Sequence, residues 1–187
     1  MTSKDERKTQ ILDAAVRVFS RKGYHLTDVQ EIADALKIGK GTIYRYFPTK
    51  KKLFGAVMQR EINRHFEAVH NKFEDEKNPV KFLEKAIRTH MEFFSKDMDL
   101  IELYMHSRSE FKEDFSKYEK IHMGKSEEII RKCMAMGLMK KADPKAVVSV
   151  LTDLFYGMLF TACLEKRTNF RQKGENIINI FIKNLMK

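Results

Sequence analysis

The sequence contains few prolines and glycines, which interrupt helices, and few cysteines, which form disulfide bonds. Its 187 residues include only 3 prolines, 8 glycines and 2 cysteines, and no tryptophan. Few prolines and glycines, together with many leucines, lysines and glutamates, favour a mostly helical chain. Cys133 and Cys163 form no C-x-x-C motif, which excludes a disulfide framework and fits a reducing, cytoplasmic compartment.

Long hydrophobic runs are also missing. The first ten residues, MTSKDERKTQ, contain no apolar core of a secretory signal. The longest uncharged run in the last third of the chain extends from Leu154 to Leu164, and a membrane span needs about 20 residues. We therefore expect a soluble, cytoplasmic protein with no membrane partner.

Catalytic and metal-binding patterns are missing as well. The sequence has no phosphate-binding glycine motif and no nucleophile elbow. Glu102 and His106 are four residues apart and could share a metal ion, but an ordinary surface pair is the simpler interpretation. We expect a protein that is not an enzyme and that has no metal and no cofactor.

Positive charge is concentrated at the N-terminal end. The formal net charge is +10, and residues 1–60 hold 13 basic against 6 acidic residues, whereas the rest holds 23 against 20. Such an asymmetry indicates one end that binds a polyanion and one end that is more neutral.

Within the basic end, residues 27–50 have the pattern of two short helices joined by a turn. The first helix, 28–36, is indicated by apolar residues at helical spacing, namely Val29, Ile32, Ala33 and Leu36. Thr27 is expected to cap this helix, with Gln30 completing a capping box. A turn follows over residues 37–40, in which Gly39 is expected to take a positive φ.

The second helix of this pattern carries basic and aromatic residues. Ile43 and Phe47 are four residues apart and can face inward, and Pro48 ends the helix. Residues 37–52 include six basic and no acidic residues. Two helices joined by such a turn form a helix-turn-helix pattern, whose second helix enters the major groove of DNA.

The segment KGTIYRYFPTKKKLF resembles the TetR family of bacterial transcriptional regulators. The family signature is matched by Lys40, Gly41, Thr42, Ile43, Tyr44, Arg45, Tyr46, Phe47 and Lys50. The upstream segment GYHLTDVQEIADAL is similar to the family's first two helices, and the resemblance covers about residues 7–58. It implies an all-helical homodimer whose C-terminal domain dimerises and often holds a small ligand that releases DNA.

The resemblance also implies roles for single residues. Gln30 and Lys40 would reach base edges, and Gly41 would let the backbone approach DNA. Tyr44 would touch a thymine methyl group or a phosphate, and Arg45 completes the candidate set. Phosphates would be held by Thr27, Thr42, Tyr46 and Lys50.

Three positions depart from the family pattern. Asp28 stands where a hydroxyl residue is common, and its negative charge would repel phosphate, so we assign it no contact with DNA. Lys37 stands where glycine commonly ends the helix, which suggests a strained or reshaped turn. Gly39 replaces a common serine, at the cost of one phosphate contact.

The fold class expected is all-α, with an N-terminal three-helix helix-turn-helix domain and a C-terminal helical domain for dimerisation and ligand binding. The domain ranges are 1–50, within a family-type unit of about 4–64, and 51–187. A first helix over 4–22 ends at Gly23, and a long helix starts at Lys50 and ends near Asn71. Residues 74–79 are the best candidate for a break. Further helices are expected over 79–96, 98–108, 112–137, 143–166 and 172–186.

Two of these helices indicate a homodimer. The helix over 143–166 is apolar on more than one face, and the C-terminal helix has a wide apolar stripe. A helix that is apolar on two sides must be buried on two sides. Two such helices per protomer would make a four-helix dimer interface, although both could instead pack inside a monomer.

Methionine and aromatic residues are frequent between residues 79 and 160. Methionine adapts to irregular apolar shapes, and ligand pockets are mostly apolar with few polar groups. We predict a site for a small lipophilic effector, with a well-filled methionine-rich core as the equal alternative. The candidate residues are His90, Phe93, Phe94, Glu102, Tyr104, Met105, His106, Phe155 and Tyr156.

Together these patterns predict a DNA-binding transcriptional regulator, most simply a repressor that a lipophilic effector releases from a near-palindromic operator in double-stranded DNA. Two other classes remain open. One is a non-specific architectural DNA binder, and the other is a carrier of apolar ligands whose basic end contacts something other than DNA.

Overall fold

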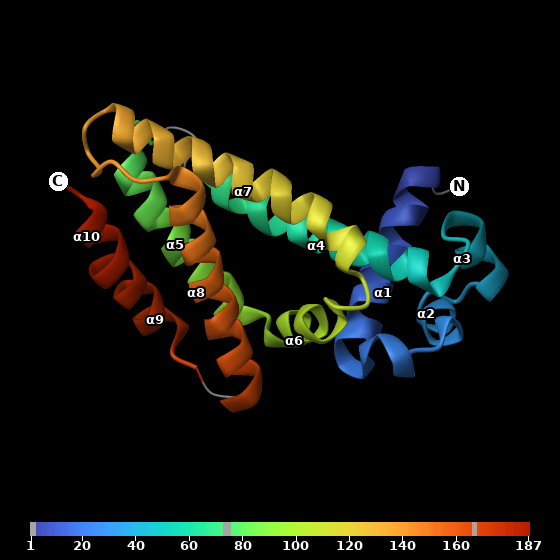
Figure 1. Cartoon of the computed structure of the whole chain (residues 1–187). Coiled ribbons are helices and arrows are strands. Elements are labelled where there is room, and N and C mark those ends of the chain that lie inside the picture. Colours follow the sequence, from blue (N-terminus) through green and yellow to red (C-terminus); the bar gives the residue numbers. More distant parts are fainter. Residues whose placement is uncertain (1–2, 73–75, 166–167) are drawn as a thin grey trace. The chain divides into compact units, whose positions relative to one another are not determined.

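The computed structural model describes residues 3–72, 76–165 and 168–187, and within these ranges it is all-α without a β-strand (Figure 1), which confirms the expected fold class. The N-terminal helices are α1 (Lys4–Leu26), α2 (Val29–Ala35), α3 (Lys40–Tyr46) and α4 (Lys50–Lys72). They are followed by α5 (Pro79–Lys96), α6 (Met98–Ser107), α7 (Lys112–Ala135) and α8 (Pro144–Glu165). The C-terminal stretch consists of α9 (Phe170–Asn176), a π-helix (Ile177–Ile182) and α10 (Lys183–Leu185).

The chain forms two compact units. Unit 1 comprises residues 1–62 and 99–115, and unit 2 comprises residues 63–98 and 116–187. Helix α4 therefore supplies its first half to unit 1 and its second half to unit 2. The division into two functional domains at residue 50 stays a prediction, and residues 74 and 75 of the expected break lie outside the described residues.

The core of unit 1 begins with the apolar stripe of α1. Ile11 and Phe19 from α1 are fully buried, as are Ile32 from α2 and Ile43 from α3. Gly23 has a φ of 75° and interrupts the helical geometry of α1, a conformation that glycine adopts without steric cost. This confirms the expected helix break at Gly23.

Residues far along the chain complete that core. The rings of Tyr24, Phe54 and Phe111 contact one another, with centroid distances of 4.5 to 5.0 Å. Phe111 is only 1% exposed. Burying aromatic rings against each other supplies both apolar area and favourable ring geometry. The segment 99–115 is therefore part of the folded unit that contains α2 and α3, which no pattern in the sequence had indicated.

Unit 2 has its own core, built by α5, α7, α8 and the C-terminal stretch. Its buried residues include Ile87, Ile130, Val148 and Ile178. Helix α9 lies close against α5, since a Cβ atom added to Gly174 would lie 2.5 Å from Cγ of Met91. A larger residue at position 174 would therefore force the side chain of Met91 to move.

Local signals for helix ends in unit 2 were largely correct. Asn78 caps α5, and Pro79 occupies its first turn. Asp143 accepts a hydrogen bond from the backbone N–H of Lys145 at the start of α8. The expected last helix was wrong in its start and its regularity. It begins at Phe170, capped by Asn169, and its middle is a π-helix.

Helix α8 has a length and composition that bear on the membrane question. It is 22 residues long, and among the described residues it is the one helix long and apolar enough to cross a bilayer. Core helices of soluble proteins can have the same length and composition. The uncharged run from Leu154 to Leu164 is only the C-terminal part of this helix. In unit 2 one side of α8 joins the core through Val147, Val148 and Leu151, while Phe160 and Leu164 remain 58% and 69% exposed.

Candidate nucleic-acid interface

Helices α2 and α3 form the predicted pair of short helices joined by a turn (Figure 1). Helix α2 packs against both α1 and α3. Ile43 is fully buried, and Phe47 is 5% exposed, which confirms that these two residues hold α3 to the core. The remaining side chains of α3 are then directed away from the core.

The turn between the two helices differs from the expectation. Gly39 has a φ of −74°, so the predicted positive φ at this position was wrong, and the left-handed residue is Lys37 with a φ of 52°. The backbone N–H of Lys37 donates to the carbonyl of Asp34, and that of Ile38 donates to the carbonyl of Ala33. These two bonds make a Schellman motif, which requires a left-handed residue directly after the helix cap.

Replacing Lys37 with glycine should therefore stabilise the protein. A side chain in the left-handed region costs about 1 kcal/mol relative to glycine. We expect urea unfolding to show an increase of about 1 kcal/mol in the free energy of unfolding of Lys37→Gly. Lys37→Ala removes the same charge but keeps Cβ, so an equal gain in that variant would contradict the explanation by backbone strain.

The cap of α2 also differs from the expectation. Asp28, and not Thr27, is the N-cap, and Glu31, and not Gln30, completes the capping box. Thr27 is 3% exposed, and its hydroxyl donates to the carbonyl of Gly23 at 2.7 Å. The aspartate can accept from the helix N–H groups directly, whereas the threonine hydroxyl is used to close the end of α1. A phosphate contact of Thr27 stays a prediction.

Both residues expected to reach base edges are bonded to carboxylates. Nζ of Lys40 donates to Oδ1 of Asp28 at 2.7 Å, and Nε2 of Gln30 donates to Oδ1 of Asp34 at 2.7 Å. The pKa of Asp28 is lowered, first by the backbone N–H of Gln30 and then by Lys40. The pKa of Lys40 is raised, chiefly by its hydrogen bond to Asp28. Asp28 and Lys40 therefore stay ionised near neutral pH.

The exposed side of α3 presents the other candidate residues. Gly41, Tyr44 and Arg45 are exposed, and a guanidinium N–H of Arg45 donates to the hydroxyl of Thr42 at 3.4 Å. Tyr46 is half-buried. A Cβ atom at Gly41 would meet no atom within 4 Å. Gly41 is therefore not required by the packing of unit 1, which fits a close approach from outside.

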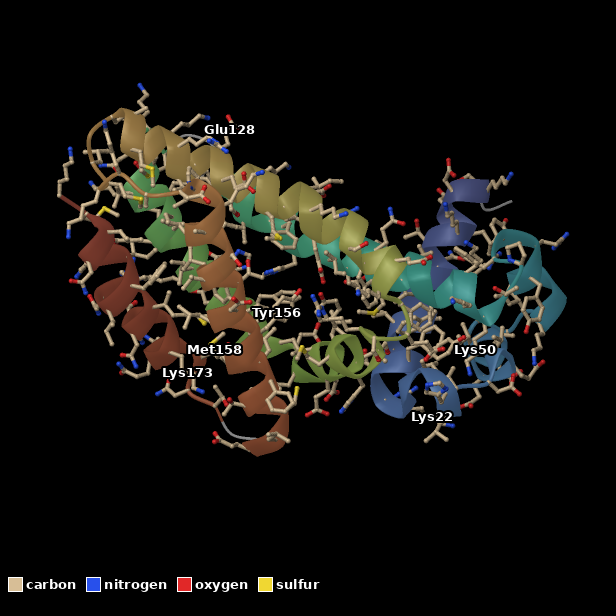
Figure 2. The ribbon with its side chains drawn as sticks, viewed as in Figure 1. Lys22, Lys50, Glu128, Tyr156, Met158 and Lys173 are labelled. Carbon is tan, nitrogen blue, oxygen red and sulfur yellow. The ribbon has the colours of Figure 1, made fainter. Side chains whose placement is uncertain are left out.

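Lys50 follows α3 as the first residue of α4. Its Nζ donates to the backbone carbonyl of His25 at 3.1 Å and lies 4.8 Å from the ring centroid of Tyr24. These contacts restrict the side chain and leave N–H groups for a further acceptor. Figure 2 labels Lys50 in the same unit as α1, α2 and α3.

These features define a helix-turn-helix unit of the kind that places its second helix in the major groove of DNA. Residues 11–57 match the family model described as bacterial regulatory proteins, tetR family. This match confirms the resemblance to the family that the motif from Lys40 to Lys50 indicated.

Individual relatives agree with this assignment. The chain is 32% identical over 94 residues to the transcriptional activator FasR of Mycolicibacterium smegmatis, covering 50% of this chain and 43% of FasR. It is 39% identical over 59 residues to the transcriptional repressor KstR of Mycobacterium tuberculosis, covering 32% of this chain and 27% of KstR. The matches thus span less than half the length of these two relatives.

A solved structure shares the fold of nearly the whole chain. FadR of Bacillus subtilis in complex with stearoyl-CoA superposes with a TM-score of 0.81 at 20% identity, covering 92% of this chain and 96% of that chain. This similarity shows that the C-terminal helices also have the fold found in such regulators.

The predicted effector residues are divided between the two units. Glu102, Tyr104, Met105 and His106 belong to unit 1, and His90, Phe93, Phe94, Phe155 and Tyr156 belong to unit 2. Within unit 2, the ring of His90 lies 5.7 Å from that of Phe155, and Phe94 lies 6.4 Å from Phe155. The hydroxyl of Tyr156 donates to a carboxylate oxygen of Glu119 at 2.8 Å. Unit 2 thus brings four of its five candidates into one aromatic cluster.

The residue at the centre of that cluster, His65, was missed. His65 is 8% exposed, its Nε2 is hydrogen-bonded to Nδ1 of His90, and its ring centroid lies 3.9 Å from that of Phe93. Burial, with a smaller effect of nearby His122, lowers the pKa of His65 to about 4. The spacing of Met58, Ile62, His65 and Val69 on α4 could have indicated this inward position.

An open groove lies elsewhere in unit 2, between α8 and the C-terminal stretch. Its lining includes Leu154, Met158, Lys173 and Ile177, and Figure 2 shows Met158 and Lys173 on these two elements. The groove contains none of the predicted effector residues. Among the described residues, no group of three potential metal ligands comes together.

Proposed function

We propose that this protein is a cytoplasmic, homodimeric transcriptional repressor that binds a specific, near-palindromic operator. The observation that carries this proposal is the exposed side of α3, where Lys40, Tyr44 and Arg45 project from a buried Ile43 anchor. The match to the tetR family over residues 11–57 supports DNA as the partner. Bound at a promoter, the protein would exclude the transcription machinery.

The proposed dimer is supported by an exposed apolar surface on unit 2, which we call the α8 face. Its members are between 41% and 69% exposed and comprise Val150, Leu154, Phe160, Leu164 and Ile180. A second copy of the same surface would remove these side chains from water, at about 25 cal/mol per Å² of apolar area. Two recognition helices in one dimer would then contact half-sites about 34–36 Å apart.

The proposed effector is a small lipophilic molecule, and we suggest a long acyl chain or its thioester. The aromatic cluster of unit 2 around His90, Phe94 and Phe155 supports an apolar ligand. The fold shared with FadR, whose structure contains stearoyl-CoA, supports the acyl class. Binding would need to favour one arrangement of the DNA-binding helices by only about 1–3 kcal/mol to control the operator.

A melting screen tests this effector proposal. Purified protein would be heated with fatty acids, acyl thioesters and cationic apolar drugs, and native mass spectrometry would count the bound molecules. We expect acyl compounds to raise the melting temperature and to weaken operator binding. No shift with any apolar compound would favour a filled methionine-rich core and refute the effector.

Two alanine variants test the proposed DNA contacts. Lys40→Ala should relax the choice of sequence at one base position and cost about 1–3 kcal/mol at the operator. Lys50→Ala should weaken binding to all duplexes similarly, because it removes one phosphate contact. The salt slope, which is the change of log affinity with log salt concentration, should become smaller by about 1. Fluorescence anisotropy on operator and non-operator duplexes at several salt concentrations measures both effects. Equal behaviour of the two variants would contradict the division into base and phosphate contacts.

The same titrations separate the two other classes of function. A non-specific architectural protein would show steep salt dependence with equal affinity for all duplexes. A carrier of apolar ligands would bind lipid and show no affinity for DNA above that for other polyanions.

A further inference from the structure

Asp28 is an acidic residue at the predicted DNA-binding surface, and it makes two hydrogen bonds there. One of its oxygens, Oδ1, accepts hydrogen bonds from the backbone N–H of Gln30 at 2.8 Å and from Nζ of Lys40 at 2.7 Å. The first bond caps α2, and the second reaches Lys40, the first residue of α3, which is the proposed recognition helix. Asp28 therefore connects the start of α2 to the start of α3.

The charge of Asp28 opposes the charge of its surroundings. Residues 37–52 contain six basic residues and no acidic one, and the side chain of Asp28 is 60% exposed. A lysine ammonium is a flexible point charge that attracts any phosphate, independent of sequence. A carboxylate bonded to that ammonium both neutralises it and repels the phosphates it could otherwise bind.

The bond to Asp28 uses only part of the donor capacity of Lys40. An ammonium has three N–H donors, and Asp28 accepts one of them. The remaining two can donate to the O6 and N7 acceptors that guanine presents in the major groove. Asp28 thus leaves Lys40 able to bind a base while opposing its movement to the backbone.

We propose that Asp28 is a specificity-determining residue, which holds Lys40 for base recognition and lowers the affinity for non-operator DNA. This inference rests on the proposed function as a sequence-specific regulator. It assigns Asp28 no contact with DNA, since its effect is exerted through Lys40.

The neighbouring carboxylate of Glu31 provides a matched control. Glu31 lies in the first turn of the same helix, but its partner is Lys22 on α1. Glu31→Gln changes the net charge by the same amount as Asp28→Asn, and glutamine can still complete the capping box. Asparagine and serine are both good N-cap residues, so Asp28→Asn and Asp28→Ser should leave α2 folded.

The experiment compares operator and non-operator affinities by fluorescence anisotropy at several salt concentrations. In Asp28→Asn and Asp28→Ser, we expect non-operator affinity to rise roughly threefold to tenfold and its salt slope to increase by about 1, because Lys40 gains a phosphate. The ratio of operator to non-operator affinity should fall accordingly. Glu31→Gln should keep the ratio of the unmodified protein.

A double variant separates the effect on Lys40 from a general effect of charge. In a Lys40→Ala background, Asp28→Asn should leave the affinity ratio unchanged. An equal fall of the ratio with and without Lys40, or no fall in either Asp28 variant, would overturn the role of Asp28. Absence of any operator preference in the unmodified protein would instead refute the proposed function itself.

Discussion

Replacing Phe160 with aspartate should convert the proposed homodimer into monomers and lower operator affinity at least about 100-fold. Phe160 is 58% exposed, so the change should leave the folded protomer intact. In the dimer, however, the new carboxylate would be buried in the α8 face without a partner, at a cost of several kcal/mol. A loss of about 2.8 kcal/mol of binding free energy already lowers the affinity about 100-fold.

Light scattering coupled to size-exclusion chromatography measures the mass, and anisotropy measures the operator affinity. Phe160→Leu keeps an apolar side chain at the same position and should remain dimeric with nearly unchanged affinity. A dimer that survives Phe160→Asp, or a monomeric Phe160→Asp that keeps full operator affinity, would contradict the proposed interface or its role.

Acidification should destabilise the protein through His65. The pKa of His65 is lowered to about 4 in the folded protein, and an unfolded histidine has a pKa near 6.5. Above about pH 6.5 neither state binds the proton. As the pH falls below that value the unfolded state is protonated first, and stability is lost until the pH reaches the folded pKa. Between pH 7.5 and 4.5 this amounts to about 2.5 kcal/mol.

His65→Phe should remove this part of the acid sensitivity while keeping a ring next to Phe93. Urea unfolding at pH 7.5 and 4.5 gives the change in the free energy of unfolding for each protein. His106 is exposed, so His106→Gln should retain the pH dependence of the unmodified protein. An unchanged pH dependence in His65→Phe would show that His65 is not a buried neutral histidine.

Most helices were predictable because their signals are local. Pro79 marked the start of α5, and Gly23 marked the break in α1, since each restricts the backbone at its own position. The errors arose where two local candidates competed. The left-handed residue of the turn is Lys37 and not Gly39. The hydrogen bonds that end α2 require a left-handed residue at position 37, although glycine adopts this conformation more easily than lysine.

The candidate site was predictable only in part, because some of its contacts depend on tertiary packing. Residue types on α3 indicated DNA, but the bond between Lys40 and Asp28 depends on how α2 and α3 pack, and the two residues are twelve positions apart. The contact of Phe111 with Tyr24 and Phe54 depends on tertiary packing over an even longer separation. No periodicity within one segment carries that information.

The most direct test of sequence-specific binding by a dimer is selection of binding sites from random duplex DNA at near-physiological salt. We predict enrichment of an inverted repeat whose half-sites are about one helical turn, or a multiple of it, apart. Recovery of DNA without a common motif, or no recovery from a protein shown to be free of bound ligand, would contradict the account.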